Sequence, residues 1–123
     1  MTDKGKCFSG VNRGQRNKSD FYQTPYSMTM QLLESEEFDY NGTCSEPCCG
    51  KGAIVDVLKK YFNPQLLISS DLRYGYDFLK EELCRPDYII TNPPFSLAFE
   101  FVQKAKKTVN DKFCFLLPLS YLH

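Results

Sequence analysis

The chain has 123 residues, with 15 basic and 15 acidic side chains, one histidine and six cysteines. This length is typical of a single small domain and argues against a multidomain protein. With 42% hydrophobic and 24% charged residues, the composition also argues against a disordered chain, a collagen-like repeat or a bare disulfide scaffold. Apolar runs fall far short of the roughly 20 residues that span a bilayer, and no signal sequence follows the first methionine. We therefore expect a reducing, intracellular location and no membrane partner.

The cysteines do not have the spacing of a metal site. Cys44, Cys48 and Cys49 lie in one segment, the others are at positions 7, 84 and 114, and the single histidine is the last residue. No Cys-x-x-Cys pair is present, whereas structural zinc sites are built from such pairs. We interpret the cysteines as small, partly buried thiols and predict no metal.

Charge is unevenly distributed although the net charge is zero. Residues 1–18 hold five basic side chains and one acidic one, a net charge of +4, so the rest of the chain carries −4. This segment has several glycines and no helical or strand periodicity, so we predict a flexible basic arm at 1–18, followed by one domain at 19–123. The arm is either a solvated tail or a segment that contacts phosphates.

From residue 19 onward, patterns typical of helices and strands alternate. Thr24 is predicted to cap a helix that has Pro25 at its first position and ends near Glu37. Apolar periodicity predicts a second helix from residue 54 to 62, before Pro64, and a third that is capped by Ser96. The segments expected to form strands are 43–48, 66–70, 88–91 and 112–117, with a further short candidate at 77–78. Strands separated by helices predict an open, mostly parallel α/β sheet.

The first candidate ligand loop follows the first predicted strand. In open α/β sheets, ligands bind beyond the carboxyl ends of the strands, where glycines let the backbone approach them. Residues 46–52 read Glu-Pro-Cys-Cys-Gly-Lys-Gly. They do not match the phosphate-binding loop, because Ser45 stands five positions before Gly50 and Gly52 follows Lys51, and they do not match the dinucleotide fingerprint, because position 55 is Val. Asp71 ends the next strand, 19 residues after Gly52. A carboxylate at that separation is suited to ribose hydroxyls, and a helix-cap or turn role for Asp71 is the alternative.

The second candidate loop is Asn92-Pro93-Pro94-Phe95, directly after the third predicted strand. Two prolines stiffen the loop and remove backbone donors. The Asn92 side-chain oxygen and the Pro93 carbonyl are therefore suited to accept the hydrogens of an exocyclic amine and hold it in line with an electrophile. If the amine belongs to a nucleobase, Phe95 is suited to stack on the flat ring of that base. The alternative for this motif is an ordinary turn.

Together, the loop at 46–52, Asp71 and the Asn-Pro-Pro-Phe motif resemble the S-adenosylmethionine-dependent amino-methyltransferases. The closest likeness is to the DNA adenine-N6 methyltransferases of phages and restriction-modification systems. It extends to the segment from Tyr22 to Pro25 and to the Asp77-Phe78 pair. The resemblance implies a Rossmann-like class I methyltransferase fold and site-specific methylation of the adenine N6 amine. It further implies S-adenosylmethionine as cofactor, double-stranded DNA as partner, no metal, and the cytoplasm of a bacterial or phage-infected cell.

The resemblance also assigns roles to individual residues. The loop at 46–52 would wrap the methionine part of the cofactor, Asp71 would bind its ribose, and Asp77 would accept from its adenine amine. Leu72 and Phe78 would flank the cofactor's adenine ring. The residues implied to bind the cofactor are Tyr22, Thr24, Pro25, Glu46, Pro47, Cys48, Gly50, Gly52, Asp71, Leu72, Asp77 and Phe78. The residues implied to hold a flipped-out adenine are Asn92, Pro93, Pro94 and Phe95.

The chain also departs from the family pattern. Lys51 stands where a small residue is common, so its side chain should point outward, and Phe95 stands where Tyr or Trp is equally usual. Domains of this family have seven strands, so we expect a partial domain, truncated before the last two strands. The strand at 112–117 would then be an exposed edge that invites pairing with a second copy or aggregation.

Two other functions stay open. One is methylation of a glutamine amide in protein or of an RNA base, since these planar amines suit the same motif. The other is a non-catalytic remnant that self-associates through the open edge.

Overall fold

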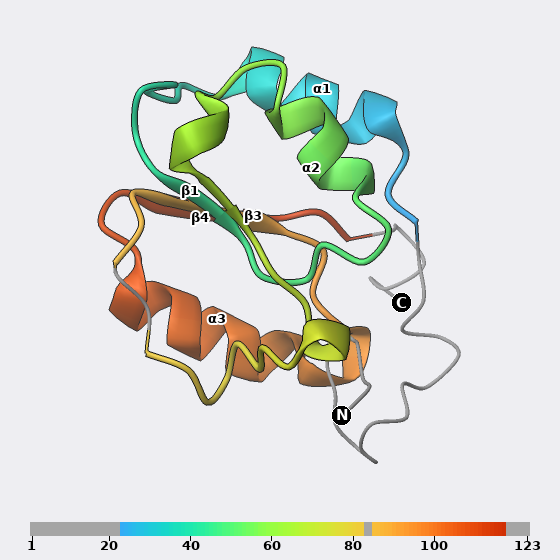
Figure 1. Ribbon diagram of the computed structural model, residues 1–123, viewed down its shortest axis with the longest axis vertical. Coiled ribbons are helices and arrows are strands. Elements are labelled where there is room, and N and C mark those ends of the chain that lie inside the picture. Colours follow the sequence, from blue (N-terminus) through green and yellow to red (C-terminus); the bar gives the residue numbers. More distant parts are fainter. Residues whose placement is uncertain (1–22, 83–84, 118–123) are drawn as a thin grey trace.

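A computed structural model describes residues 23–82 and 85–117 as a small sheet with helices on both faces (Figure 1). The helices are α1 (Tyr26–Ser35), α2 (Ala53–Leu58) and α3 (Ala98–Thr108). The strands are β1 (Cys44–Glu46), β2 (Leu67–Ser69), β3 (Tyr88–Thr91) and β4 (Lys112–Phe115). The strands lie in the order β2-β1-β3-β4 and every pair is parallel. The predicted parallel α/β architecture is therefore confirmed, whereas the predicted arm at 1–18 and Tyr22 lie outside the described residues.

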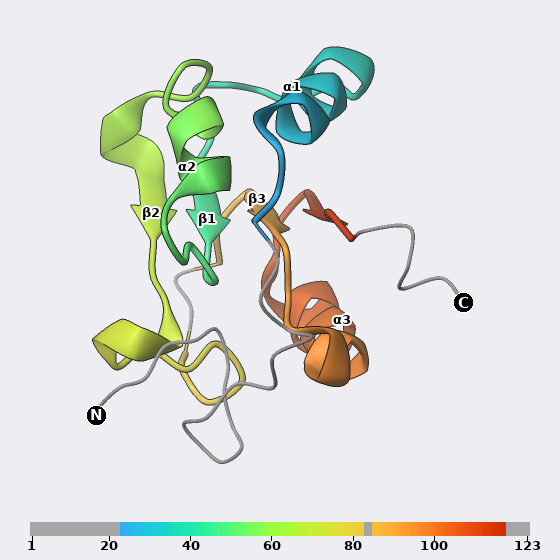
Figure 2. The same ribbon diagram turned by 90° about the vertical axis from the view of Figure 1, so that its right-hand side faces the viewer.

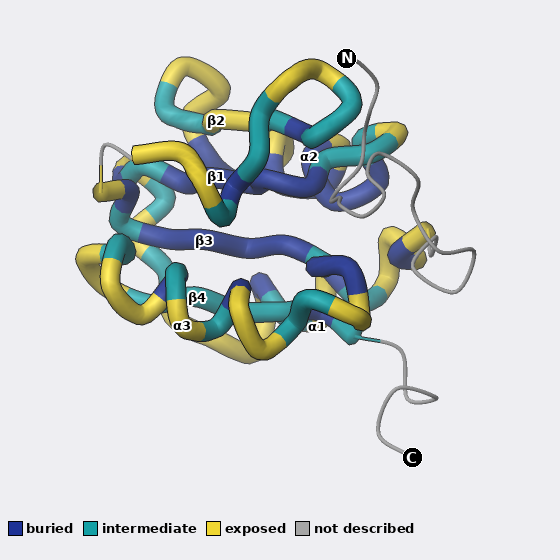
Figure 3. Tube along the Cα trace, turned by 90° about the horizontal axis from the view of Figure 1, so that it is seen from below, coloured by how far each residue is buried: buried dark blue, intermediate teal, exposed yellow. Residues whose placement is uncertain are grey.

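The molecule has three layers, with α1 and α2 over one face of the sheet and α3 over the other (Figure 2). β3 is buried along its whole length, in the middle of the molecule (Figure 3). Its side chains alternate between faces: Tyr88 and Ile90 pack with α1 and α2, whereas Ile89 packs with Phe101 and Ala105 of α3. A strand covered on both faces reads as a continuous apolar run, which explains why its predicted bounds match the observed ones.

Several predicted element boundaries are wrong, each for a local reason. Pro25 is extended, with ψ 142°, and precedes α1 rather than forming its first turn; no side chain caps this helix, and Thr24 is buried instead. The regular part of α2 ends at Leu58, after which the Lys60 and Tyr61 N–H groups donate to carbonyls three residues back, in tighter turns. Asn63 is extended, since helical geometry is disfavoured for the residue before a proline. Phe62 nevertheless stays in the core, as its spacing predicts.

Two further predictions fail near the carboxyl ends of the strands. Ser96 does not cap α3, because a 3₁₀ turn at Phe95–Leu97 precedes this helix. The segment at 77–78 is a turn rather than a strand. Its Asp77 accepts a side-chain hydrogen bond from the Leu79 N–H, and the Asp77 carbonyl accepts from Lys80 and Glu81. Such local bonds compete with a strand ladder.

The predicted exposed edge is β4. Within the described residues, β4 pairs only with β3, and β2 forms the other edge of the sheet. Pairing with a second copy through β4 stays a prediction.

Candidate functional site

The site lies at the point where the strand order reverses. From β1 the chain passes to β2 on one side and then crosses to β3 on the other side of β1. In open parallel sheets, the crevice beyond the carboxyl ends of two such strands is where ligands bind. The loop at 46–52 begins at the end of β1, and Asn92 directly follows β3. The topology thus brings the two predicted loops to neighbouring positions on one edge.

Glu46 connects these two strand ends. It is only 1% exposed. Its Oε2 accepts a hydrogen bond from the backbone N–H of Cys48, at 2.8 Å, and one from the hydroxyl of Thr91 at the end of β3. A buried carboxylate is costly unless donors compensate it. These bonds therefore fix the turn after β1 and tie it to the strand that carries the Asn-Pro-Pro-Phe motif.

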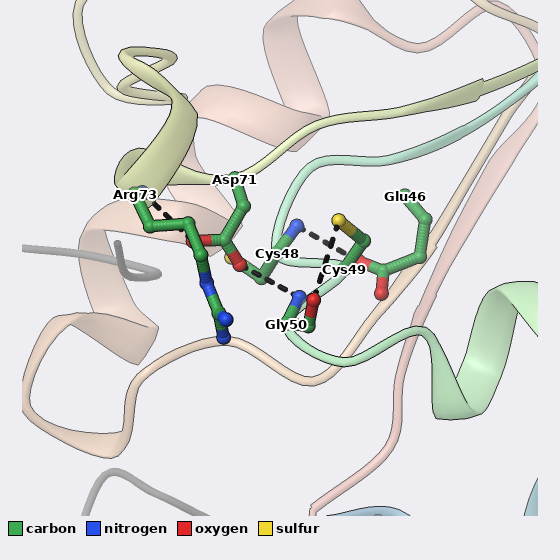
Figure 4. Close-up of polar contacts among 6 residues, drawn as sticks. All are labelled: Glu46, Cys48, Cys49, Gly50, Asp71 and Arg73. Carbon is green, nitrogen blue, oxygen red and sulfur yellow. Dashed lines mark hydrogen bonds and ion pairs between the residues drawn. The ribbon is translucent and has the colours of Figure 1, made fainter. Parts of the chain in front are cut away.

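Asp71 holds the middle of the same loop (Figure 4). Its carboxylate is fully buried; Oδ2 accepts from the Gly50 N–H at 2.7 Å and Oδ1 from the Arg73 N–H at 2.9 Å. The Arg73 Nε lies 3.7 Å from Oδ1. Asp71 therefore caps the 3₁₀ turn at Leu72–Tyr74, which is the alternative role that its sequence position allowed. Contact of Asp71 with a ribose stays a prediction.

The backbone of the loop depends on its glycines and on β2. Gly50 and Gly52 have φ of 52° and 90°, a left-handed conformation that other residues rarely adopt. The Cys49 N–H donates to Ser70 O at 2.9 Å, and the Ser70 N–H donates to Glu46 O at 3.0 Å. These bonds continue the β1–β2 pairing into the loop. Lys51 is exposed, in agreement with the prediction that its long side chain points outward.

Burial disfavours the thiolate form of Cys44, Cys49 and Cys114. Burial raises the pKa of Cys49 to about 12, with Glu46 and Asp71 adding to the shift. Burial also raises the pKa of Cys44 well above its ordinary value, and that of Cys114. A thiol with a raised pKa stays protonated at neutral pH and is a poor nucleophile and metal ligand. Within 23–82 and 85–117, no cluster of three or more metal-ligating side chains is present.

The second loop combines a sheltered amide with an accessible ring. Pro93 and Pro94 are buried, and so is the side-chain oxygen of Asn92. Phe95 is 46% exposed. The Pro94 carbonyl accepts from the Leu97 N–H at 3.0 Å and so starts the 3₁₀ turn that leads into α3. The motif is thus held between a buried strand and a helix, with one aromatic ring directed partly to solvent.

Of the predicted adenine-contact residues, Asp77 and Phe78 lie in the turn at 76–82, and Leu72 lies in the 3₁₀ turn at Leu72–Tyr74. Asp77 and Leu72 are half-buried, whereas Phe78 is 2% exposed, with its ring centroid 4.7 Å from that of Phe101. The Phe78 ring is therefore part of the core in this arrangement. Asp77 and Leu72 are the more accessible members of the predicted set.

Sequence reasoning missed Lys104 of α3. Its ammonium donates to the Phe78 and Glu81 carbonyls, both at 2.6 Å, and lies 5.3 Å from the centroid of the Phe78 ring. Burial lowers the pKa of Lys104, which acidic neighbours partly oppose. A signal was present, because Lys104 follows Phe101 by three residues and helical spacing puts both on one face. Lys104 attaches the turn at 76–82 to the helix that begins beside the second loop.

Thr24 and Pro25 lie near the first loop through α1. The Tyr26 hydroxyl, next to Pro25, donates to Asp56 of α2 at 3.0 Å. Because α2 starts directly after Gly52, the beginning of α1 lies beside the end of the loop. Thr24 is buried and Pro25 is exposed. The described members of the predicted cofactor set thus lie around one edge of the sheet.

A hollow of about 640 Å³ lies at the opposite edge, between the residues before β1 and the start of β4. Lys112 is already placed in its wall: the ammonium donates to the Glu37 carbonyl at 2.5 Å and lies 5.0 Å from the centroid of the Phe38 ring. Neither predicted loop contributes to this hollow.

The comparisons with known proteins do not assign the chain to a family. No protein-family model matches the chain, and no curated protein sequence matches it. Among the described residues, every helix is too short or too polar to cross a bilayer.

Proposed function

We propose that the protein transfers the methyl group of S-adenosylmethionine to the N6 amine of adenine in DNA. One observation carries the proposal: the loop after β1 and the Asn-Pro-Pro-Phe loop after β3 end neighbouring strands at the reversal of strand order, joined by the Glu46–Thr91 hydrogen bond. Methyl transfer needs a cofactor and an acceptor side by side, and this edge of the sheet offers one loop suited to each.

The residues of the first loop fit such a cofactor. A Cβ added at Gly50 or Gly52 would meet no atom nearer than 3.8 Å or 3.7 Å, so the outer side of the loop has room for a ligand against the backbone. Glu46, Asp71 and Asp77 place three carboxylates around this edge, which favours a cationic ligand. Residues 46–52 would hold its methionine part, and Leu72 with the turn at 76–82 would hold its adenosine part.

The second loop would hold the acceptor. The lone pair of an exocyclic amine is delocalised into the ring, so the amine is a weak nucleophile. The Asn92 side-chain oxygen and the Pro93 carbonyl would accept its two hydrogens and favour a tetrahedral nitrogen. The exposed ring of Phe95 would stack on the base, which is worth roughly 1–3 kcal/mol. Bound S-adenosylmethionine supplies an activated methyl group, whose transfer leaves a neutral thioether and requires the amine to lose one proton to solvent.

The charge distribution supports nucleic acid over protein as the acceptor. The net charge of +4 in residues 1–18 is concentrated in one segment, beside a remainder of −4. A basic segment of this kind is suited to phosphate contact. We assign DNA contact to this segment and amine binding to the loop after β3.

The test is transfer of a tritiated methyl group from S-adenosylmethionine to three acceptors: adenine-containing duplex DNA, RNA and a glutamine-containing protein. We expect incorporation into DNA, lost in Asn92→Ala and retained in Met30→Ala, a change on the exposed side of α1. Incorporation into DNA that survives Asn92→Ala would overturn the mechanism. Incorporation only into RNA or protein would overturn the choice of acceptor, and no incorporation with any acceptor would leave the non-catalytic alternative.

A further inference from the structure

A line of exposed side chains runs along the outer face of α3. It consists of Phe99, Gln103 and Lys106, here called the α3 stripe, and Phe99 is 70% exposed. Residues spaced by four and seven positions lie on one face of a helix, so the three side chains form a continuous line. At a rise of 1.5 Å per residue, the line is roughly 10 Å long.

The α3 stripe starts at the candidate acceptor loop. Phe95 lies four residues before Phe99, in the 3₁₀ turn that leads directly into α3, and it too is partly exposed. The opposite face of α3 packs on the sheet, where Phe101 and Ala105 are buried. Two aromatic rings, one amide and one ammonium thus follow one another away from the Asn-Pro-Pro-Phe motif.

Single exposed aromatic residues are common and need no explanation. The α3 stripe differs in its order, since rings at the loop are followed by a cation about two helical turns away. A nucleic-acid strand offers partners for both kinds of group, since each nucleotide carries a flat base on a backbone of anionic phosphates. Proteins that bind single strands combine aromatic stacking platforms with basic side chains along the backbone path.

We propose that the α3 stripe binds the nucleic-acid strand next to the target base. Phe99 stacks on the unpaired base that neighbours the target, and Lys106 pairs with a phosphate of the same strand. Gln103, between them, offers donors and an acceptor to a base edge. The inference rests on the proposed function for its choice of ligand and adds a substrate class to it: duplex DNA that has an unpaired base, as at a mismatch or bulge, beside the target adenine.

The experiment measures binding without cofactor, by fluorescence anisotropy of a short fluorescein-labelled single-stranded DNA oligonucleotide. Phe99→Leu removes the ring but keeps apolar bulk, and we expect it to weaken binding about 5- to 150-fold, as loss of one stacked base does. Phe99→Tyr keeps the ring and should bind like the parent protein. Met30→Ala, an exposed apolar change on α1, is the matched control and should have no effect.

Lys106 is tested by the salt dependence of the same binding. Lys106→Ala should reduce the slope of log affinity against log salt by about 0.7, the contribution of one phosphate contact to a single strand. Lys60→Ala, an exposed lysine just after α2, should leave the slope unchanged. Far-UV circular dichroism confirms that each variant is folded.

The inference is overturned if Phe99→Leu binds the oligonucleotide as tightly as Met30→Ala does. It is also overturned if Phe99→Leu weakens binding of an intact duplex of the same sequence, whose bases are stacked inside, by the same factor. An RNA oligonucleotide that behaves like DNA supports the shared chemistry. Because the assay needs no methyl transfer, a Phe99-dependent affinity without methylation would overturn the proposed function and leave the binding surface in place.

Discussion

Lys104 offers a direct test of how α3 holds the turn at 76–82. Lys104→Met removes the ammonium and keeps an apolar stem of similar length. Its two hydrogen bonds, to the Phe78 and Glu81 carbonyls, are both 2.6 Å long. A hydrogen bond with a charged donor contributes about 1.5–3 kcal/mol when it is sheltered and less when water can replace the acceptor.

The bond to Phe78 is partly buried, whereas the bond to Glu81 is exposed. We therefore assign about 1.5 kcal/mol to the first and about 0.5 kcal/mol to the second. The ammonium near the Phe78 ring adds about 0.5 kcal/mol at a partly exposed site. The free energy of unfolding should fall by roughly 2–3 kcal/mol, with a lower Tm.

The assay is urea unfolding, followed by tyrosine fluorescence, since the chain has eight tyrosines and no tryptophan. Lys107→Met, on the exposed side of the same helix, is the control and should change stability by less than about 0.5 kcal/mol. If Lys104→Met were as stable as this control, the bonds to the turn would contribute nothing, and the reasoning from their lengths would be wrong.

Three further predictions concern the loops. Gly52→Ala should cost about 1–2 kcal/mol in urea unfolding, because φ is 90° there. Gly75→Ala, at the same φ in another turn, should cost a similar amount. Native Cys49 should resist alkylation by iodoacetamide at pH 8 and react in urea, as peptide mapping would reveal. Because burial raises the pKa of folded Cys49 to about 12, the stability that the buried thiol contributes is present at neutral pH and declines above pH 9. Hydrogen bonds from Thr43 lower the pKa of Asp87, so its contribution should be present above pH 3.8, decline as pH falls below that value, and vanish from the pH dependence of Asp87→Asn.

Much of the architecture was predictable because it depends on periodicity. Tyr88 to Thr91 form a continuous apolar strand, and the spacing of Ile54, Leu58 and Phe62 identifies the face of the second helical segment. The glycine-rich loop and the Asn-Pro-Pro-Phe motif could be assigned to strand ends because those ends follow the same periodic runs. Their placement on adjacent strands required the strand order, which no local pattern specifies.

What was missed depends on contacts between distant segments. The carboxylate of Asp71 was predicted from its distance in sequence to Gly52, but its bond to the Gly50 N–H appears only in the folded loop. Glu46 was assigned to the cofactor, whereas its bond to the Thr91 hydroxyl joins two strands. Lys104 was overlooked because a lysine on a helix is usually solvated, and only the turn beneath it supplies the carbonyls.

The most direct test of the central claim is nucleoside mass spectrometry of adenine-containing duplex DNA after incubation with the protein and S-adenosylmethionine. The account predicts N6-methyldeoxyadenosine with the parent protein and with Met30→Ala, and none above background with Asn92→Ala. Equal amounts of N6-methyldeoxyadenosine with the parent protein and Asn92→Ala, or none with either, would contradict it.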